Sequence, residues 1–418
     1  MKPTSPTSCV SETRLAKDGG APAVVTKLAP LVRWGEPELQ QLTEMIRQPS
    51  LFYWNGPQTR LLVERFRTIF PLRHAMPCSS GTAAIHIAVH AAGVGPGDEV
   101  ITSPITDMGT VIGILYQQGV PVFADLESDR YNLDPADVRR KITPRTKAIL
   151  AVHLAGNPCD LHRLREIADE HRLVLIEDCA QAWGARFAGR PVGTVGDLGC
   201  WSLNDFKHIG AGDGGIVATN SEKFGSLLQR CGDKAYDRVK QTRAPEFLAP
   251  NYRISEPQSA VAAAQMLRME EIAAARNRLG MRLAEKLAEI PGLRPPRVAK
   301  GDFCSFWFFM LRMDPSAFRC DRAEFVEALK AEGAAAGAGY IPTPLYRYPV
   351  FQNHNFFAGR WPVKELGLTA IDYRTTRCPE AEAILETAIL CPLNQGMDET
   401  FIRETAEAFH KVATHYRK

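Results

Sequence analysis

Short apolar runs alternate with amphipathic segments over the first half of the chain. The runs are four to six residues long, which is typical of strands buried on both faces of a parallel sheet. Between them, apolar residues recur with helical spacing. The predicted strands are 99–102, 120–124, 148–153 and 173–176, and the predicted helices between them are 106–118, 135–142 and 161–171. This alternation predicts an α/β fold with a mainly parallel central sheet flanked by helices, whose ligand sites lie outside the carboxyl ends of the strands.

The pattern changes in the second half of the chain. A long Ala-rich helix is expected from Pro257 to about Ile290, and the remainder alternates as in a smaller α+β domain. There we predict strands at 304–311 and 389–393 and helices at 322–332 and 398–416. With 418 residues the chain is too long for one compact core. We therefore expect a flexible N-terminal tail (1–30), a large domain (31–265) and a small C-terminal domain (266–418).

Composition excludes several classes of partner. The net charge of +3 is spread along the chain without a basic block, which argues against nucleic acid or an anionic membrane surface as a partner. No apolar run reaches the roughly 18 residues that a spanning helix needs. None of the 10 cysteines forms a C-x-x-C pair, which favours buried, reduced thiols and a cytoplasmic protein.

One stretch, 173–218, carries an unusual order of polar groups. Asp178 ends a buried strand, Gln181 follows three positions later, Ser202 ends a second apolar run, and Lys207 comes five positions after it. Taken singly, each is an ordinary surface, turn or capping residue. Together they suit pyridoxal 5′-phosphate (PLP): the lysine forms a Schiff base, the aspartate holds the pyridinium nitrogen and the serine binds phosphate.

Two glycine-containing segments bear on anion binding. Gly81 and Thr82 open an Ala-rich helix, whose free N–H groups and positive dipole end form an anion site; a plain capped helix start explains the same residues. Residues 210–215 match G-x-G-x-x-G, but a dinucleotide fingerprint needs a strand before it and a helix after it. Here a lysine-bearing polar segment precedes and a strand-like run follows, so the glycines are expected to present Lys207.

Several motifs, in order, resemble those of one family. They are S-G-T-A-A (80–84), G-P-G-D-E-V-I (95–101), P-V-F-A-D (121–125), I-E-D-C-A-Q-A-W-G-A (176–185), V-G-T-V-G-D (192–197), S-L-N-D-F-K-H-I-G-A-G-D-G-G (202–215) and N-Y-R-I-S (251–255). From about residue 31 to its end the chain resembles the DegT/DnrJ/EryC1/StrS sugar aminotransferases, which are fold type I PLP enzymes.

The resemblance implies a reaction, a cofactor and a set of roles. The reaction is transfer of an amino group from glutamate or glutamine to a keto-sugar or cyclitol ketone, often nucleotide-linked, in a homodimer with shared active sites. The implied roles are Schiff-base formation for Lys207, pyridinium binding for Asp178, contact with the ring hydroxyl for Gln181, phosphate binding for Gly81, Thr82 and Ser202, and contact with the neighbouring subunit's phosphate for Asn251. A PLP-dependent sugar dehydratase and a PLP-binding regulatory protein stay open as alternatives.

One position departs from the family pattern. After the strand at 99–102 the family usually has threonine and then an aromatic residue that stacks on the pyridine ring, whereas this chain has Thr106 and Asp107. Met108 or Trp183 could cover the ring instead. On the substrate side, the aromatic loop 52–54 and the loop 340–348, with Arg347, are candidates to line the pocket, and equally for interface or core positions.

Overall fold

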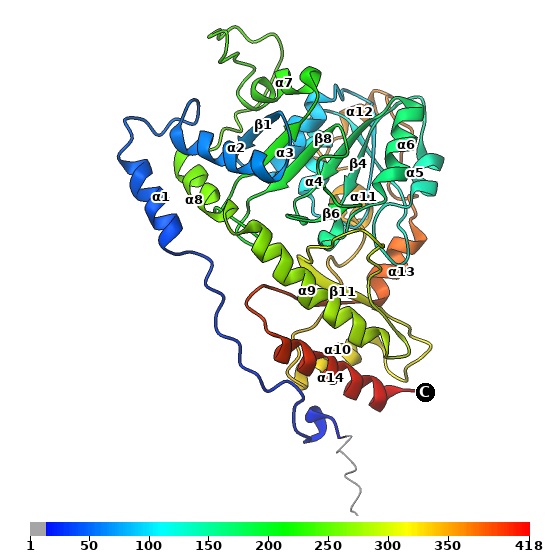
Figure 1. The fold of residues 1–418 in the computed structure, drawn as a ribbon. Coiled ribbons are helices and arrows are strands. Elements are labelled where there is room, and N and C mark those ends of the chain that lie inside the picture. Colours follow the sequence, from blue (N-terminus) through cyan, green and yellow to red (C-terminus); the bar gives the residue numbers. More distant parts are fainter. Residues whose placement is uncertain (1–13) are drawn as a thin grey trace, which may run out of the picture.

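The computed structural model describes residues 14–418 and contains a seven-stranded sheet in the order β1-β9-β8-β5-β4-β2-β3 (Figure 1). The strands are β1 (His74–Cys78), β2 (Glu99–Thr102), β3 (Val120–Phe123), β4 (Thr146–Val152), β5 (Val174–Asp178), β8 (Leu198–Ser202) and β9 (Gly215–Thr219). Strands β8, β5, β4, β2 and β3 run parallel; β9 pairs antiparallel with β8, and the edge strand β1 pairs antiparallel with β9 and therefore runs in the same direction as β8. The predicted α/β fold with a mainly parallel sheet is confirmed.

Helices cover both faces of this sheet. Along β4, Ala148, Leu150 and Val152 belong to the apolar core under α3 and α7, whereas Ile149 and Ala151 belong to the core under α2, α6 and α8. This division follows from the alternation of side chains along a strand. The helices of this domain are α1 (Glu36–Ile46), α2 (Pro57–Ile69), α3 (Gly81–Ala91), α4 (Gly109–Tyr116), α5 (Pro135–Lys141), α6 (Leu161–His171), α7 (Glu222–Gly232) and α8 (Glu256–Met266).

A second core lies in the C-terminal part of the chain. There a four-stranded antiparallel sheet, in the order β10-β11-β13-β12, packs with three helices. Its elements are β10 (Leu293–Arg294), β11 (Phe308–Met313), β12 (Gly337–Ala338), β13 (Ala388–Pro392), α9 (Met269–Ala288), α10 (Arg322–Ala331) and α14 (Glu399–Tyr416). The single helix predicted over 257–290 is interrupted at 267–268, because α8 packs on α1 and α2 while α9 packs on α14. The predicted domain boundary at 265/266 falls just before this break.

The described part of the N-terminal segment differs from the flexible tail expected over 1–30. Residues 14–30 run along the small domain in Figure 1, and two buried carboxylates hold them there. Glu332 accepts hydrogen bonds from the backbone N–H groups of Ala16 (2.8 Å) and Ala23 (3.0 Å), and Glu404 accepts from that of Thr26 (2.8 Å). The rest of the expected tail, residues 1–13, lies outside the described residues.

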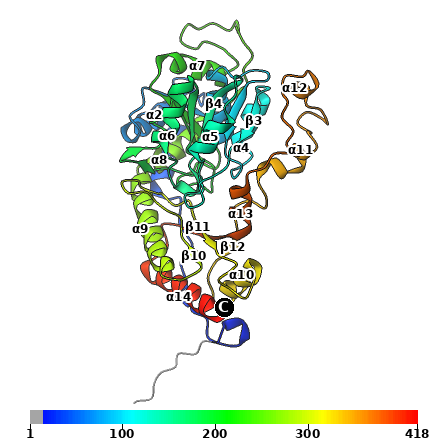
Figure 2. The same cartoon turned by 90° about the vertical axis from the view of Figure 1, so that its right-hand side faces the viewer.

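Another part of the C-terminal half packs on the large sheet. The segment 345–387, which includes α11 (Pro349–Gln352), α12 (Pro362–Glu365) and α13 (Pro379–Thr387), lies beside β3 in Figure 2. Tyr346, Phe351 and Tyr373 pack against Phe123 of β3 with ring centroids 5.5–5.9 Å apart. These aromatic residues cover the edge of the sheet, which would otherwise present an unpaired strand.

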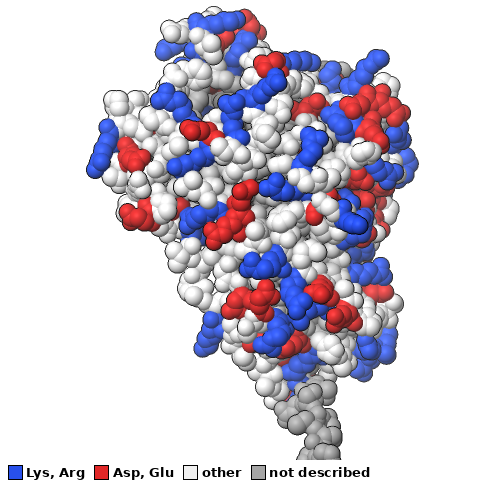
Figure 3. Space-filling view, in the orientation of Figure 1, with Lys and Arg blue, Asp and Glu red and all other residues white. Residues whose placement is uncertain are grey.

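Surface and cysteines agree with the expectations from composition. On the face seen in Figure 3, basic and acidic side chains are interspersed. No helix among residues 14–418 combines the length and apolar character needed to cross a bilayer. The nine cysteines within these residues are buried and free.

Candidate active site

A cavity of about 270 Å³ opens at the carboxyl ends of β5 and β8, next to the first turn of α3 and the loop before α4. It brings together seven of the eight predicted site residues, separated by more than a hundred positions in the chain. They are Gly81, Thr82, Asp107, Asp178, Gln181, Ser202 and Lys207. Asn251 does not line this cavity; it is exposed, and its side-chain oxygen accepts a hydrogen bond from Arg253 Nε (2.7 Å).

Asp178 is the buried acid of the cavity. It is 4% exposed at the end of β5, and its carboxylate accepts hydrogen bonds from Thr110 Oγ1 (2.8 Å) and the backbone N–H of Ala180 (3.0 Å). Burial raises its pKa, against these two donors and the more distant Lys207. Thr110 is itself bonded to Thr106 (2.7 Å), so the first turn of α4 and the loop before it fix the carboxylate. A cationic partner inside the cavity would stabilise the ionised form.

The opposite side of the cavity has the features of an anion site. Ser80 caps α3 by accepting from the N–H of Ala83 (3.0 Å), and the first N–H groups of a helix have no intrahelical acceptor. At Gly81 an added Cβ would lie 2.7 Å from Ser202 Cβ. Only glycine at position 81 therefore allows the first turn of α3 to approach Ser202 this closely. An anion in the cavity could then contact both.

Lys207 reaches the cavity from the loop after β8. It is 9% exposed, and burial lowers its pKa to about 8, although Asp178 and Asp107 favour its charged form. The loop is held at its backbone: the N–H of Lys207 donates to Asn204 O (2.9 Å), and Arg33 Nη2 donates to Lys207 O (2.7 Å). A buried amine with a pKa near neutrality is suited to nucleophilic and proton-transfer chemistry.

Gln181 connects the cavity to the small domain. Its side-chain oxygen accepts from the N–H of Ala155 (2.9 Å), so its amide N–H₂ is free to donate, and it does so to Tyr340 Oη (3.2 Å). Tyr340 begins the loop that the sequence offered as a substrate-side candidate. Arg347 of the same loop pairs instead with Glu382 (2.7 Å).

Among residues 14–418, no aromatic residue lines the cavity beside Asp107. Asp107 is exposed at the cavity, and its Oδ1 accepts from the N–H of Gly109 (2.8 Å). Trp183, one candidate to cover a bound ring, is fully buried behind Ser202, donates to the Ser202 carbonyl (2.7 Å) and packs on Phe66. Met108, the other candidate, does not line the cavity. Neither candidate therefore lines the cavity in the structure.

Two residues near the cavity escaped the sequence prediction. Thr110 holds Asp178, and its spacing of four from Thr106 on a predicted helix was the available signal. Trp307 approaches from the small domain, and no local pattern indicates such a long-range contact.

A buried cluster of His153, Glu177 and Cys179 lies behind the strand end. Glu177 accepts from His153 Nε2 (3.0 Å) and from three backbone N–H groups of the loop 193–196. His153 Nδ1 accepts from the N–H of Cys159 (3.0 Å). Because the imidazole and the carboxylate already have protein partners, the cluster is a structural network rather than a metal site.

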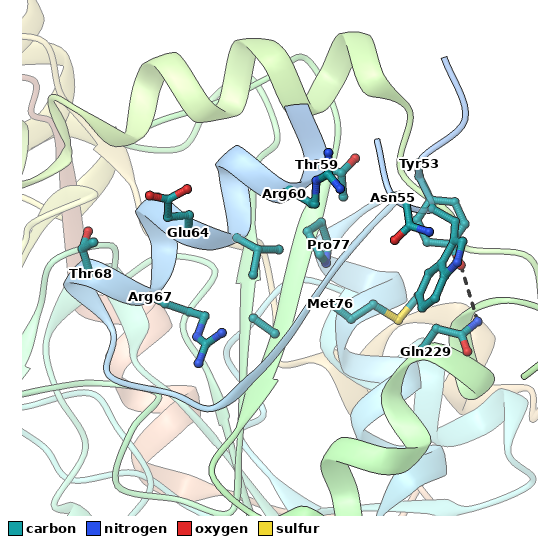
Figure 4. A pocket seen from close by; sticks show the side chains of 13 residues that line it. Tyr53, Asn55, Thr59, Arg60, Glu64, Arg67, Thr68, Met76, Pro77 and Gln229 are labelled. Carbon is teal, nitrogen blue, oxygen red and sulfur yellow. Dashed lines mark hydrogen bonds between the residues drawn. The ribbon is translucent and has the colours of Figure 1, made fainter. Parts of the chain in front are cut away.

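A larger cavity, of about 580 Å³, lies elsewhere on the large domain between α2, β1 and the aromatic loop (Figure 4). Tyr53 and Trp54 line it, so the structure places these two loop residues here rather than beside Lys207. Tyr53 Oη donates to Asp233 (2.6 Å). No lysine lines this cavity, and its acid Glu64 lies on the surface of α2 among arginines. The smaller cavity is therefore the candidate active site.

Comparison with known proteins gives the same picture. Residues 33–410 match the model of the DegT/DnrJ/EryC1/StrS aminotransferase family. The chain is 33% identical to the L-glutamine:2-deoxy-scyllo-inosose aminotransferase of Streptomyces kanamyceticus, over 97% of this chain and 98% of that protein. The solved aminotransferase of Psychrobacter cryohalolentis superposes with a TM-score of 0.83 at 25% identity, over 93% and 100% of the two chains. DesI, solved in the presence of its TDP-sugar product, gives 0.79 at 27% identity over 96% of each chain.

Proposed function

Since the chain belongs to the DegT/DnrJ/EryC1/StrS aminotransferase family, we propose that it transfers an amino group from glutamine or glutamate to the ketone of a cyclitol or sugar, with PLP held in the Lys207 cavity. The observation that carries the proposal is the arrangement around that cavity. A buried carboxylate, an anion-binding helix start and a buried amine face one space of about 270 Å³. The matched relatives act on a cyclitol ketone and form a nucleotide-linked sugar, as their names state.

The residues present fit PLP. Asp178 has only uncharged hydrogen-bond donors, so a protonated pyridine nitrogen would be its missing cationic partner. The close approach of Gly81 to Ser202 beside the first turn of α3 suits a phosphate. Gln181 lines the cavity, and the N–H of its amide that is not bonded to Tyr340 would be able to donate to the ring hydroxyl. When bound, PLP withdraws electrons from the carbon that bears the amino group, so that a proton on it can leave.

Each residue then has a definite task. Lys207 would hold the cofactor through its amine and would move the proton between carbon atoms; a pKa of about 8 leaves part of the amine unprotonated near neutrality. Asp178 keeps the ring nitrogen protonated. Thr110 and Ala180 keep that carboxylate in place. Thr82 and Ser202 orient the phosphate end.

We further propose a homodimer in which Asn251 reaches the partner's site. Asn251 is exposed and does not line the cavity of its own chain, as expected of a residue that serves another subunit. Mixed dimers test this: Asn251→Ala and Lys207→Ala chains are each expected to lose most activity alone. Mixing them is expected to restore one intact site per heterodimer. A monomer by light scattering, or mixed dimers with no recovery, would exclude shared sites.

The main test is chemical. Holoenzyme is reduced with borohydride and digested, and the cofactor-bearing peptide is expected to contain Lys207. Labelled glutamine and glutamate are then offered with 2-deoxy-scyllo-inosose and with nucleotide-linked keto-sugars. Lys207→Ala is the inactive variant, and Lys141→Ala, at the end of α5 and outside the cavity lining, is the control. Cofactor on another lysine, or deoxygenated product without amine transfer, would contradict the proposal.

A further inference from the structure

The amine of Lys207 lies over the face of an indole. Its Nζ is 3.7 Å from the centroid of the Trp307 ring, well within the roughly 6 Å over which a cation is attracted to an aromatic face. The indole N–H also donates to the carbonyl of Phe206 (2.7 Å), the residue just before Lys207. One side chain from the small domain therefore contacts both the backbone of the lysine loop and the lysine amine.

The backbone that carries Trp307 is tightly fixed. Ser305 and Trp307 donate through their N–H groups to Gly156 O (3.0 Å) and Ala155 O (2.9 Å). Phe306, between them, has a φ of 42°, and Ala155 has a φ of 58°. Non-glycine residues adopt such left-handed conformations at a cost and keep them where the surroundings impose them, often at functional sites. The indole is thus held at this position, rather than resting there by chance.

We propose that the Trp307 indole binds the Lys207 amine whenever that amine is not joined to the cofactor, which makes Trp307 a positioning residue for amino transfer. The inference rests on the proposed function, in which Lys207 is released and rebound in each cycle. Within residues 14–418, Nζ forms no ion pair with any of the three carboxylates that line the cavity, those of Asp107, Asp178 and Asp213. The indole face holds the free amine away from the carboxylate of Asp178, which would be needed at the ring nitrogen.

The charged groups around the Lys207 amine determine how the indole affects its pKa. Asp178 at the end of β5 and Asp107 before α4 favour the ammonium form, while burial opposes it. His208, next in the chain, is neutral because burial holds its pKa well below the usual value, and Arg33 donates to the Lys207 carbonyl. A cation–π contact favours the ammonium form as well. Removing the ring should therefore lower the pKa of Lys207.

The test measures that pKa directly in the enzyme loaded with pyridoxamine phosphate, in which the Lys207 amine is free. Competitive acetylation with acetic anhydride across a pH series, read by peptide mass spectrometry, gives the protonation midpoint at Lys207. We expect Trp307→Leu to lower this midpoint by about one pH unit. Trp307→Phe, which keeps a smaller aromatic face, should give a smaller shift in the same direction. Trp54→Leu, which removes a half-buried indole at the other cavity, should give none.

An unchanged midpoint in both Trp307 variants would overturn the inference, even if their KM for the ketone rises, because that result would make Trp307 only a wall of the substrate site. If Trp307→Leu does not fold, Trp307→Phe alone decides the sign of the shift. Borohydride mapping of the wild-type holoenzyme separates this from the function itself. Cofactor on a lysine other than Lys207 refutes the proposed function, whereas cofactor on Lys207 with an unchanged midpoint refutes only the role of Trp307.

Discussion

Replacing Glu177 by glutamine changes one atom of a fully buried side chain, and the structure indicates how much that atom matters. Oε2 of Glu177 accepts from His153 Nε2 (3.0 Å) and Gly193 N (2.6 Å), and Oε1 accepts from Val195 N (2.9 Å) and Gly196 N (2.5 Å). A glutamine amide has one oxygen and one N–H₂ group. Whichever way it turns, the N–H₂ group meets two donors.

The histidine cannot adapt to this change. Its Nδ1 accepts from the N–H of Cys159, so the ring proton of a neutral imidazole must sit on Nε2, facing position 177. Two hydrogen bonds to a charged acceptor are therefore lost in Glu177→Gln. Such bonds contribute about 1.5–3 kcal/mol each, so we expect a loss of about 3–6 kcal/mol. That is a large fraction of the roughly 5–15 kcal/mol by which native proteins are stable.

Native-state hydrogen exchange is the direct measurement, because the lost bonds fasten one loop. In Glu177→Gln the amides of 193–196 should exchange much faster than in the wild type, and the thermal midpoint should fall. Glu170→Gln, at an exposed position on α6, is the control and should change neither. Equal protection of the loop in Glu177→Gln and the wild type would refute the reasoning.

The same network gives a pH dependence. Burial alone would raise the pKa of Glu177, but the hydrogen bonds from His153 and the loop N–H groups outweigh it and lower that pKa. A carboxylate with a depressed folded-state pKa contributes stability that is complete above its unfolded pKa of about 4.3. This contribution is lost as the pH falls through the lower folded value. Acid unfolding of the wild type should therefore begin below about pH 4 at this loop, as seen by exchange, and should be absent as a separate step in Glu177→Gln.

Three further predictions concern the cofactor cavity and the N-terminal segment. Gly81→Ala places a methyl group 2.7 Å from Ser202 Cβ and should weaken PLP binding at least about tenfold in a titration of apoenzyme. Gly337→Ala, with no atom near the new methyl group, is the control. Equal PLP affinities of the two variants would contradict the assignment of Gly81 to the phosphate site. The single-turnover rate of pyridoxamine-loaded enzyme with 2-oxoglutarate should rise with pH through about 8, where the Lys207 amine loses its proton, and a fall over that range would contradict its role as base. Glu332→Ala removes the acceptor of two backbone N–H groups and of Lys411, so trypsin should cut near Lys17 faster than in the wild type. Glu327→Ala, at an exposed position of α10, is the control and should be cut at the wild-type rate. Unchanged cleavage in Glu332→Ala would show that Glu332 does not hold the segment.

The sequence predicts the fold best where burial alone determines the structure. The run at 148–153 and the helix at 161–171 were predicted within one or two residues, because a strand covered on both faces must be continuously apolar and a covering helix amphipathic. Strand β1 was missed. It contains Pro77 and begins with a half-buried histidine, which an edge strand tolerates and an apolar pattern does not reveal.

Long-range packing accounts for the other differences. The order of Asp178, Gln181, Ser202 and Lys207 placed these residues around one cavity, because each lies at or just after the end of a strand in the same sheet. Their roles stay predictions. Nothing local indicates that the segment 14–30 binds Glu332 and Glu404, or that Trp307 reaches Lys207. Those contacts depend on how the small domain sits against the large one.

Two adjacent acids at the end of β5 have different tasks, one in stability and one in chemistry. Successive side chains of a strand point to opposite faces, so Glu177 and Asp178 cannot share an environment. Glu177 faces the loop 193–196 and is surrounded by hydrogen-bond donors, which keep it charged without a cation. Asp178 faces the cavity with only two donors, and burial raises its pKa. Glu177 fixes the strand end because donors within the protein bind its carboxylate. Asp178 has fewer donors, so its carboxylate is available to a cationic ligand.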